Sequence, residues 1–224
     1  MKIFLLPFLL IFGFITMSMI HTKKTRIVFF GDSITQMGIN KGGYIDRIQN
    51  SINEKGIQNK YELIGAGVGY DKIYDLYLRM EDDVLVKKPD VVVVYEGIND
   101  VGHKYSTHTG TDIEKYERFY TAIIKKLQAK KIRVFVCTPT LLGEKKGNVN
   151  TQDAEIDAYS DVIRKLATSM NCTLIDLRKT FVNYLQENNN NNKESGILTT
   201  DGIHPSDAGN QLLADEMMKA LYIQ

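Results

Sequence analysis

Ser33 closes the tripeptide Gly-Asp-Ser at residues 31–33, directly after a short apolar run that predicts a buried strand. A serine hydroxyl at the end of such a strand can attack a carbonyl carbon, but it needs an adjacent base to take its proton. Aspartate and serine are also typical of ordinary strand-to-helix turns. Thr35 stands where the motif Gly-x-Ser-x-Gly has its second glycine, which argues against the nucleophile elbow of α/β-hydrolases.

The base for such a serine must be a histidine, and the chain has four. One belongs to the N-terminal segment, and His108 lies in a polar loop without a nearby carboxylate. The other two each follow an aspartate by three residues, as Asp100–His103 and Asp201–His204. Both pairs are predicted to lie in loops, where the carboxylate can hold the Nδ1–H and leave Nε2 to accept the serine proton. The spacing therefore does not choose between them.

The surroundings of the two pairs differ. The second pair precedes the last predicted helix, which Ser206 can cap. The first pair follows Asn99 at the end of a strand, where the asparagine amide is the more useful group. A tetrahedral intermediate of acyl transfer develops a negative oxygen, so it needs N–H donors around it. Asn99, the backbone N–H of Ser33 and the loop after the second strand can supply them.

Three short blocks resemble those of the SGNH hydrolases, the GDSL esterase and lipase superfamily. They are Gly-Asp-Ser-Ile-Thr at 31–35, Gly-Ile-Asn-Asp at 97–100 and Asp-Gly-Ile-His at 201–204, in the order and at the separations typical of that superfamily. Each block alone is a weak motif, whereas three in order are a strong one. The resemblance implies Ser33 as nucleophile, His204 as base, Asp201 as its orienting partner, Asn99 as an oxyanion donor beside the Ser33 N–H, and substrate-binding roles for Asp32, Gly97 and, at the rim, His103. It implies neither a cofactor nor a metal.

The second block of the superfamily is irregular in this chain. The superfamily usually has a glycine here whose backbone N–H serves the oxyanion, and that position falls on Tyr70 in the stretch 65–71. The Tyr70 N–H can still serve, but a tyrosine would be strained if the site needs a positive φ. Gly69 could take the role through a shift of one residue. We expect the Tyr70 ring to narrow the acyl side of the pocket and to favour acetyl over long chains.

Strands and helices alternate along the rest of the chain. Short apolar runs predict strands at 26–30, 61–64, 90–95, 132–137 and 173–177, and apolar residues at helical spacing predict helices between them and near 208–221. The four valines at 91–94 indicate burial on both faces of a parallel sheet. We therefore predict one three-layer α/β/α domain over residues 25–224 with a five-stranded parallel sheet, and the resemblance implies a flavodoxin-like arrangement. Ligands of such sheets bind at the carboxyl ends of the strands.

The first 20 residues differ in composition from the rest. Lys2 precedes an apolar run to residue 20, and polarity returns at residues 21–24. This pattern is typical of a secretory signal peptide, with an uncleaved membrane anchor as the alternative. Either one predicts a secreted or periplasmic domain, which would meet a membrane only through an uncleaved N-terminal segment.

Composition and cysteines narrow the possible partners. The formal net charge is +1 with acidic and basic residues mixed along the chain, so nothing in it indicates nucleic-acid binding. Cys137 and Cys172 are the only cysteines. Their predicted places at opposite ends of neighbouring parallel strands argue against a disulfide, so both are expected to be small buried residues.

The sequence also allows other functions. The glycine-rich stretch 65–70 approaches a dinucleotide-binding fingerprint, but Tyr70 replaces its third glycine. A carbohydrate-binding relative without activity would keep the fold, and a lysophospholipase or thioesterase would use the same chemistry. The favoured hypothesis is a serine esterase that forms an acyl-enzyme and removes acetyl or other short acyl groups from a glycan or a small ester.

Overall fold

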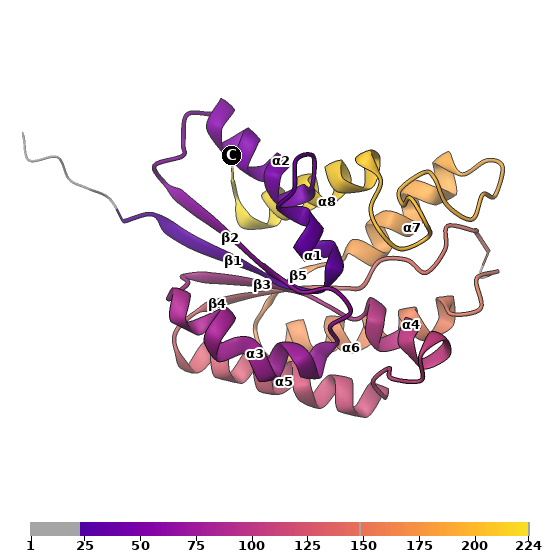
Figure 1. The fold of residues 1–224 in the computed structure, drawn as a ribbon, viewed down its shortest axis with the longest axis horizontal. Helices are drawn as coiled ribbons and strands as arrows, with labels where there is room; N and C mark the ends of the chain where they lie inside the picture. The colour runs from indigo at the N-terminus through magenta and orange to yellow at the C-terminus, as the bar shows by residue number, and fades with distance from the viewer. Residues whose placement is uncertain (1–22, 148, 224) are drawn as a thin grey trace, which may run out of the picture.

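The computed structural model describes residues 23–147 and 149–223, and its centre is one five-stranded sheet (Figure 1). All neighbouring strands are parallel and their order is β2-β1-β3-β4-β5, as the alternation of elements predicts. From β1 the chain first adds β2 on one side and then adds β3, β4 and β5 on the other side. The direction in which strands are added therefore reverses between β1 and β3. The strands are β1 (Thr25–Gly31), β2 (Tyr61–Gly67), β3 (Val91–Tyr95), β4 (Arg133–Cys137) and β5 (Thr173–Ile175).

Helices cover both faces of this sheet, which confirms the three-layer α/β/α prediction (Figure 1). One face packs against α3 (Ile73–Asp83), α5 (Ile113–Ala129) and α6 (Asp153–Ser169). The other packs against α2 (Tyr44–Glu54), α7 (Leu177–Asn188) and α8 (Asp207–Leu221). Shorter helices are α1 (Ser33–Gly38), α4 (Ile98–Ser106) and a single 3-10 turn, η1 (Leu85–Lys87).

The continuous apolar runs of the strands follow from burial on both sides. Val92 and Val94 lie in the core under α5, whereas Val91 and Val93 lie in the core under α8, and none of the four is more than 1% exposed. Because successive side chains of a strand point to opposite faces, a strand covered on both faces must be apolar throughout. Each fully buried valine stabilises the fold by about 1.5–3 kcal/mol relative to an exposed one.

The helix α5 supports the end of β3 through its tyrosines. Tyr116 and Tyr120 are completely buried, and their hydroxyls donate to the carbonyl oxygens of Glu96 (2.8 Å) and Val94 (3.2 Å). A buried tyrosine needs a partner for its hydroxyl, and here that partner is the strand that leads to Asn99. The core therefore also fixes where β3 ends.

Three helices differ from the sequence prediction. Residues 100–103 were expected to lie in a loop but belong to α4, and α1 and α7 were not predicted. The helix α1 has only six residues, and α7 begins within the predicted strand 173–177. Leu177 was expected to end a strand, but it begins α7, since Asp176 caps that helix by accepting the N–H of Lys179. Cys137 and Cys172 are unbridged as predicted; Cys137 is buried, but Cys172 is only partly so.

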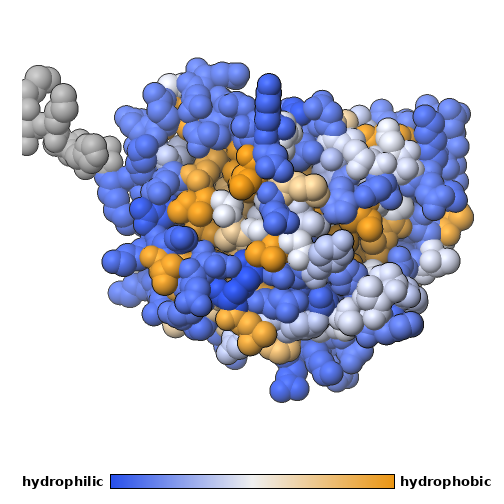
Figure 2. All heavy atoms as spheres, viewed as in Figure 1, coloured by the Kyte–Doolittle hydropathy of each residue, from blue (hydrophilic) through white to orange (hydrophobic). Residues whose placement is uncertain are grey.

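The predicted N-terminal signal or anchor, residues 1–20, lies outside the described residues. Among the helices that are described, none is long and apolar enough to cross a bilayer. Figure 2 shows a face on which apolar side chains are interspersed among hydrophilic ones.

Candidate active site

The turn that follows β1 places Ser33 at the carboxyl edge of the sheet. Gly31 ends β1, and a side chain there would meet the Tyr95 carbonyl oxygen of β3 at 2.2 Å, so only glycine fits between the two strands. Asp32 then caps α1, because its Oδ1 accepts the N–H of Ile34 (2.9 Å). Ser33 is the first residue of α1, and its N–H is one of those at a helix start that have no partner within the helix.

The segment between α7 and α8 brings His204 to this serine. The His204 Nε2 lies 3.1 Å from the Ser33 Oγ, and the His204 Nδ1 lies 2.7 Å from Oδ2 of Asp201. An ionised carboxylate can only accept, so Nδ1 carries the proton and Nε2 is free to accept from Ser33. The structure thus brings together all three residues of the predicted catalytic set.

Asp201 is held by its own turn as well as by the histidine. Its Oδ1 accepts the backbone N–H groups of Ile203 (2.9 Å) and His204 (2.8 Å). Partial burial alone would raise the pKa of Asp201, but the hydrogen bonds from the His204 ring and from these N–H groups outweigh it, and the net pKa is lowered. The lowered pKa keeps the Asp201 carboxylate ionised, so that it accepts a hydrogen bond from the Nδ1–H of His204.

Asn99, the predicted side-chain donor, is the second residue of α4. Its Nδ2 donates to the Asp71 carbonyl oxygen (2.9 Å) and lies 3.5 Å from Oδ2 of Asp32, which is at the limit of a hydrogen bond. One N–H of the amide thus binds the loop after β2, and the second makes at most a weak contact with Asp32. Gly97, at φ 142, makes the turn into α4, where a side chain would meet the Tyr116 hydroxyl at 2.7 Å.

The loop after β2 distinguishes the two predicted backbone donors. The Gly69 N–H donates to Oε1 of Gln36 (3.0 Å), so it is occupied. Within the described residues the Tyr70 N–H has no acceptor. Tyr70 has φ 67, the left-handed conformation in which a tyrosine is strained, as the sequence predicted for a site that needs positive φ. Its side chain is 78% exposed and its ring stacks on His103 with a centroid distance of 6.0 Å.

His103 does not form the alternative Asp–His pair. It lies on α4, whereas Asp100 on the same helix is fully buried and accepts the N–H of Ile73 with both carboxylate oxygens (3.3 Å each). The Nδ1 of His103 is buried and has no partner in the described part of the chain. Burial, with a smaller contribution from Lys72, lowers the pKa of His103. Its position under Tyr70 places it at the rim of the site.

Three carboxyl groups that follow the ends of β1 and β3 are buried: Asp32, Glu96 and Asp100. Burial raises the pKa of Asp32 to about 6 and of Asp100 to about 7. Burial, followed by the charges of those two aspartates, raises the pKa of Glu96 well above its usual range. Asp32 is only 2% exposed, so it supports the turn at Ser33 and does not line the surface of the site.

Arg79 is a supporting residue that sequence reasoning missed. Its guanidinium donates to the carbonyl oxygens of Gly31 (2.8 Å) and Ala66 (3.0 Å) and to the Asp71 carboxylate (2.6 Å). It therefore ties the ends of β1 and β2 to the loop that carries Tyr70. It lies among the polar positions of a predicted helix, where nothing in the sequence distinguishes it from a solvated surface residue.

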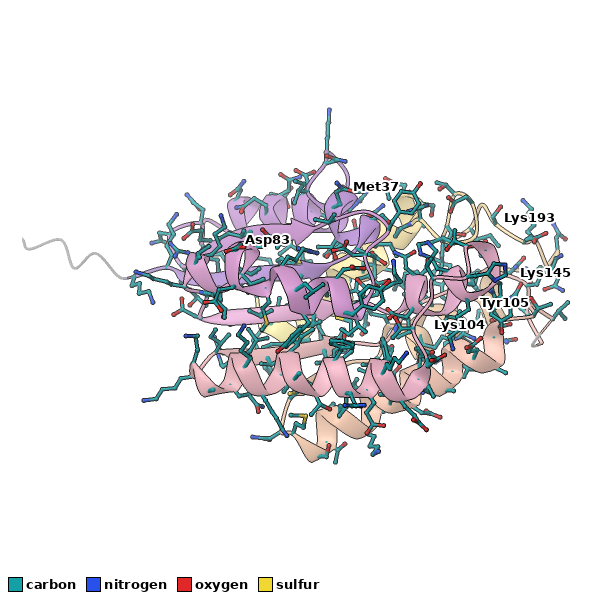
Figure 3. The ribbon with its side chains drawn as sticks, turned by 60° about the horizontal axis from the view of Figure 1, so that its bottom comes forward. Met37, Asp83, Lys104, Tyr105, Lys145 and Lys193 are labelled. Atoms are coloured by element: carbon teal, nitrogen blue, oxygen red, sulfur yellow. The ribbon has the colours of Figure 1, made fainter. Side chains whose placement is uncertain are left out.

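Two open hollows lie near the site: Ile203 lines one of them, and its neighbour His204 lines the other. One lies beside α4, and the other lies where α1 meets the start of α8. Both have polar and apolar lining side chains. Tyr105 borders the first and Met37 the second (Figure 3). No group of three or more His, Cys, Asp or Glu side chains that could hold a metal ion occurs in residues 23–147 and 149–223.

Comparison with known proteins gives a consistent result. Residues 29–212 match the model of the GDSL-like lipase/acylhydrolase family. The crystal structure of the acetyl xylan esterase AlAXEase is 56% identical, superimposes with a TM-score of 0.87, and is matched over 88% of this chain and 99% of that chain. An acetylxylan esterase of Geobacillus stearothermophilus is 23% identical over 88% of this chain and 93% of its own length. A GDSL esterase/lipase of Arabidopsis thaliana is 25% identical over 91% of this chain and 81% of its own length.

The family match spans the ends of β1 and β3 and the segment that carries Asp201 and His204. It includes every residue described above as part of the site. The structural match to AlAXEase covers nearly all of that chain, so the likeness extends to the whole domain and not to one motif. The chain therefore belongs to the GDSL-like lipase/acylhydrolase family, and it is a hydrolase that acts on ester bonds.

Proposed function

We propose that this esterase works by nucleophilic catalysis through an acyl-enzyme, with Ser33, His204 and Asp201 as its catalytic residues. The single observation that carries this proposal is the unbroken series of contacts from the Ser33 Oγ to the His204 Nε2 (3.1 Å) and from the Nδ1 to Asp201 (2.7 Å). A serine hydroxyl is a weak nucleophile until a base within this distance can take its proton.

In the first half-reaction the His204 Nε2 takes the Ser33 proton while the Oγ bonds to the carbonyl carbon of the ester. The carbonyl oxygen becomes an oxyanion, and the intermediate collapses when His204 gives its proton to the departing alcohol oxygen. Asp201 stabilises the imidazolium during both transfers. In the second half-reaction His204 takes a proton from water, which attacks the acyl carbon, and then returns that proton to the Ser33 Oγ. The products are a carboxylic acid and an alcohol.

Three N–H groups suit the oxyanion: the backbone N–H of Ser33, the backbone N–H of Tyr70 and the side-chain amide of Asn99. The Ser33 N–H stands at a helix start, and the Tyr70 N–H has no acceptor in the described segments. Donors that are already oriented cost no reorganisation when the charge develops, and each is worth about 3–4 kcal/mol in comparable sites.

We further propose acetyl or other short acyl groups on a glycan as the substrate. AlAXEase, more than half identical to this chain, is an acetyl xylan esterase. The open hollow that His204 lines also carries polar side chains such as Asn40 and Asn210, which could hydrogen-bond to a sugar. The N-terminal segment further supports the proposal that the enzyme acts outside the cytoplasm, where glycans occur.

The test is hydrolysis of p-nitrophenyl esters of increasing acyl length, together with acetate release from acetylated xylo-oligosaccharides, by the wild type and by Ser33→Ala. We expect the wild type to prefer the acetyl ester and to release acetate. Activity retained by the variant would exclude Ser33 as the nucleophile. Preference for long acyl chains would instead favour a lysophospholipase or thioesterase.

A further inference from the structure

The segment between α7 and α8 holds Asp201 and His204 without regular secondary structure of its own. Such a segment needs partners elsewhere in the fold, because catalysis tolerates little error in the position of the imidazole. We propose that Glu144 is the positioning residue that holds this segment against Ser33. The proposal rests on the proposed catalytic roles of Ser33, Asp201 and His204.

The carboxylate of Glu144 collects the donors of three consecutive residues. Oε2 accepts the N–H of Ile197 (3.0 Å), and Oε1 accepts the N–H of Leu198 (2.7 Å). Oε1 also accepts the N–H and the hydroxyl of Thr199, the latter at 2.7 Å. The residue is 0% exposed. Four donors from one short stretch fix both the position and the direction of the backbone that leads into the Asp201 turn.

A second set of contacts continues from Glu144 to the histidine. The Thr199 hydroxyl that donates to Glu144 also accepts the N–H of Gly202 (3.1 Å). The carbonyl oxygen of Gly202 accepts the N–H of Gly143, the neighbour of Glu144, at 2.8 Å. The Thr200 N–H donates to the His204 carbonyl oxygen (2.8 Å). The turn between Asp201 and His204 is therefore held from both sides by residues 143–144 and 199–200.

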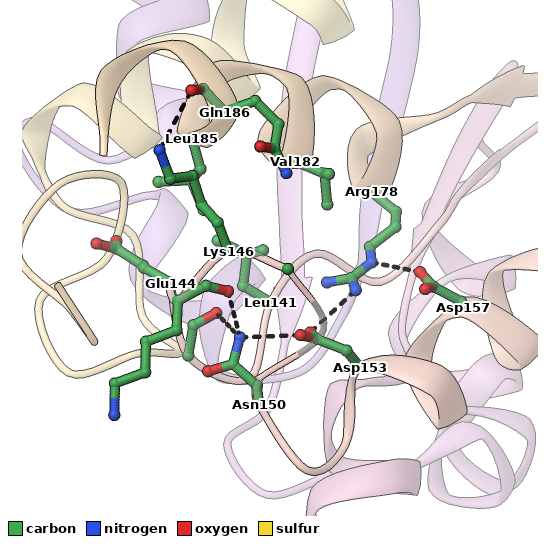
Figure 4. Close-up of a pocket in the computed structure, with 13 residues that line it drawn as sticks. Leu141, Glu144, Lys146, Asn150, Asp153, Asp157, Arg178, Val182, Leu185 and Gln186 are labelled. Atoms are coloured by element: carbon green, nitrogen blue, oxygen red, sulfur yellow. Dashed lines mark hydrogen bonds and ion pairs between the residues drawn. The ribbon is translucent and has the colours of Figure 1, made fainter. Parts of the chain in front are cut away.

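The segment that carries Glu144 is itself braced on the helices α6 and α7. The Asn150 side chain donates to the Lys145 carbonyl oxygen (2.8 Å) and to Asp153 (3.0 Å), which in turn pairs with the buried Arg178 of α7 (Figure 4). The Asn189 side chain donates to the Glu144 carbonyl oxygen (2.8 Å). The hollow in Figure 4 is lined by Leu141, Val182 and Leu185 together with polar groups, several of which hydrogen-bond to one another, so these contacts join the Glu144 segment to the two helices.

The buried charge of Glu144 is balanced by N–H and O–H donors. In the described segments no lysine, arginine or histidine forms an ion pair with it. A buried carboxylate that accepts several backbone N–H groups is stabilised by them, and these groups lose their acceptor when it is replaced. A glutamine keeps the shape but offers one oxygen and points an N–H₂ group at donors, so Glu144→Gln must move part of 197–199.

The variants are Glu144→Gln and, as a matched control, Asp90→Asn. Asp90 is also a carboxylate that accepts a backbone N–H, from Arg26 (2.9 Å), and it pairs with Lys23, but it directly precedes β3, at the end of the sheet opposite to Ser33. We expect Glu144→Gln to lower kcat by about tenfold or more while KM changes by less than about twofold. The control should lose thermal stability with its kcat within about twofold of the wild type.

Thr199→Val gives a second variant that keeps the shape of the segment and removes the hydroxyl between Glu144 and Gly202. It should lower kcat by about threefold or more, also with an unchanged KM. In both variants the proton resonance of the His204 Nδ1–H should shift or broaden, which reports on the Asp201 contact without any turnover. If the wild type hydrolyses no ester, the proposed function fails, whereas this resonance still tests the role of Glu144.

The proposal is overturned if folded Glu144→Gln and Thr199→Val both keep the wild-type kcat and the wild-type His204 resonance. It is equally overturned if Asp90→Asn loses as much kcat as Glu144→Gln, because the loss then follows stability and not position. If Glu144→Gln does not fold, Thr199→Val alone decides by the same two measurements.

Discussion

The chain contains two Asp-x-x-His sequences with the same spacing, and the fold gives their side chains different conformations and partners. In the first, Asp100 and His103 lie on α4, and the aspartate turns inward to accept the N–H of Ile73. In the second, Asp201 and His204 lie in a turn, and the aspartate holds both the ring and the backbone of the histidine. Only the second histidine reaches Ser33.

The difference comes from the backbone between the two residues. Gly202 has φ 94, a left-handed conformation that lets the chain fold back so that Asp201 faces the Nδ1 of His204. Gly102, the glycine of the first pair, lies inside α4 and adopts no such turn. The same spacing therefore gives a hydrogen-bonded Asp–His pair in a turn and two unrelated side chains in a helix.

Replacing each histidine in turn tests this difference most strongly. His204→Ala should lower kcat/KM on p-nitrophenyl acetate by about 1000-fold or more, because the serine loses its base. His103→Ala should stay within about tenfold of the wild type, since His103 contacts the rim through Tyr70. Steady-state kinetics on both variants measures the effect, and similar losses in the two would contradict the assignment of the base.

The aspartates give a smaller contrast. Asp201→Asn should lower kcat by about 100-fold, because the amide does not hold the proton on Nδ1 or stabilise the imidazolium. Water can replace part of this effect, since the Asp201 side chain is 51% exposed. Asp100→Asn should change kcat by less than about threefold, because the amide oxygen still accepts the Ile73 N–H. A larger loss from Asp100→Asn than from Asp201→Asn would reverse the roles of the two pairs.

Much of the fold could be predicted from the sequence for a simple reason. Buried parallel strands must be apolar on both faces, so continuous apolar runs such as the four valines at 91–94 indicate strands. All five strands of the sheet were predicted in this way. The helix α4 was missed because it buries only three residues, one of which is Asp100. A short helix whose buried face includes a carboxyl group does not show helical apolar spacing.

The candidate site was predictable where the chemistry needs a particular side chain. Ser33 and the two Asp–His pairs stand out because few other residue types can fill such roles. The choice of Asp201 and His204 over Asp100 and His103 came from the resemblance of the three blocks to the SGNH hydrolases. Arg79, Gln36 and Glu144 could not be found in this way, since they act on backbone groups of residues far away in the chain. Such contacts depend on which distant segments the fold brings together, and the spacing of residues in the sequence does not show this.

The buried acid of the first pair predicts a pH dependence of stability opposite in sign to that of Asp201 in the second pair. Burial raises the pKa of Asp100 from 3.8 to about 7. A raised carboxyl pKa means that the folded state holds the proton more tightly, so this contribution is full below about pH 4 and is lost as the pH rises to about 7. Asp32 and Glu96 are shifted in the same direction.

The wild-type Tm should therefore fall between about pH 4 and pH 7, and Asp100→Asn should reduce that fall by about 3 °C or more. Asp201→Asn serves as the control, because the pKa of Asp201 is shifted the other way. Differential scanning calorimetry at several pH values measures both. A wild-type Tm that rises over this range would contradict a protonated carboxyl at Asp100.

The smallest effect is expected where the first pair supports the site indirectly, through the stacking of Tyr70 on His103. Tyr70→Gly removes a ring that is 78% exposed beside the proposed oxyanion donors and keeps the backbone N–H in a conformation that glycine adopts without strain. The ratio of kcat/KM on octanoate to that on acetate p-nitrophenyl esters should rise about fivefold, because the ring no longer narrows the acyl side. Tyr70→Phe keeps the ring and should keep the wild-type ratio. His103→Ala frees the ring without removing it, so its ratio should lie between those of the wild type and Tyr70→Gly; equal ratios in all four proteins would show that acyl selection lies elsewhere.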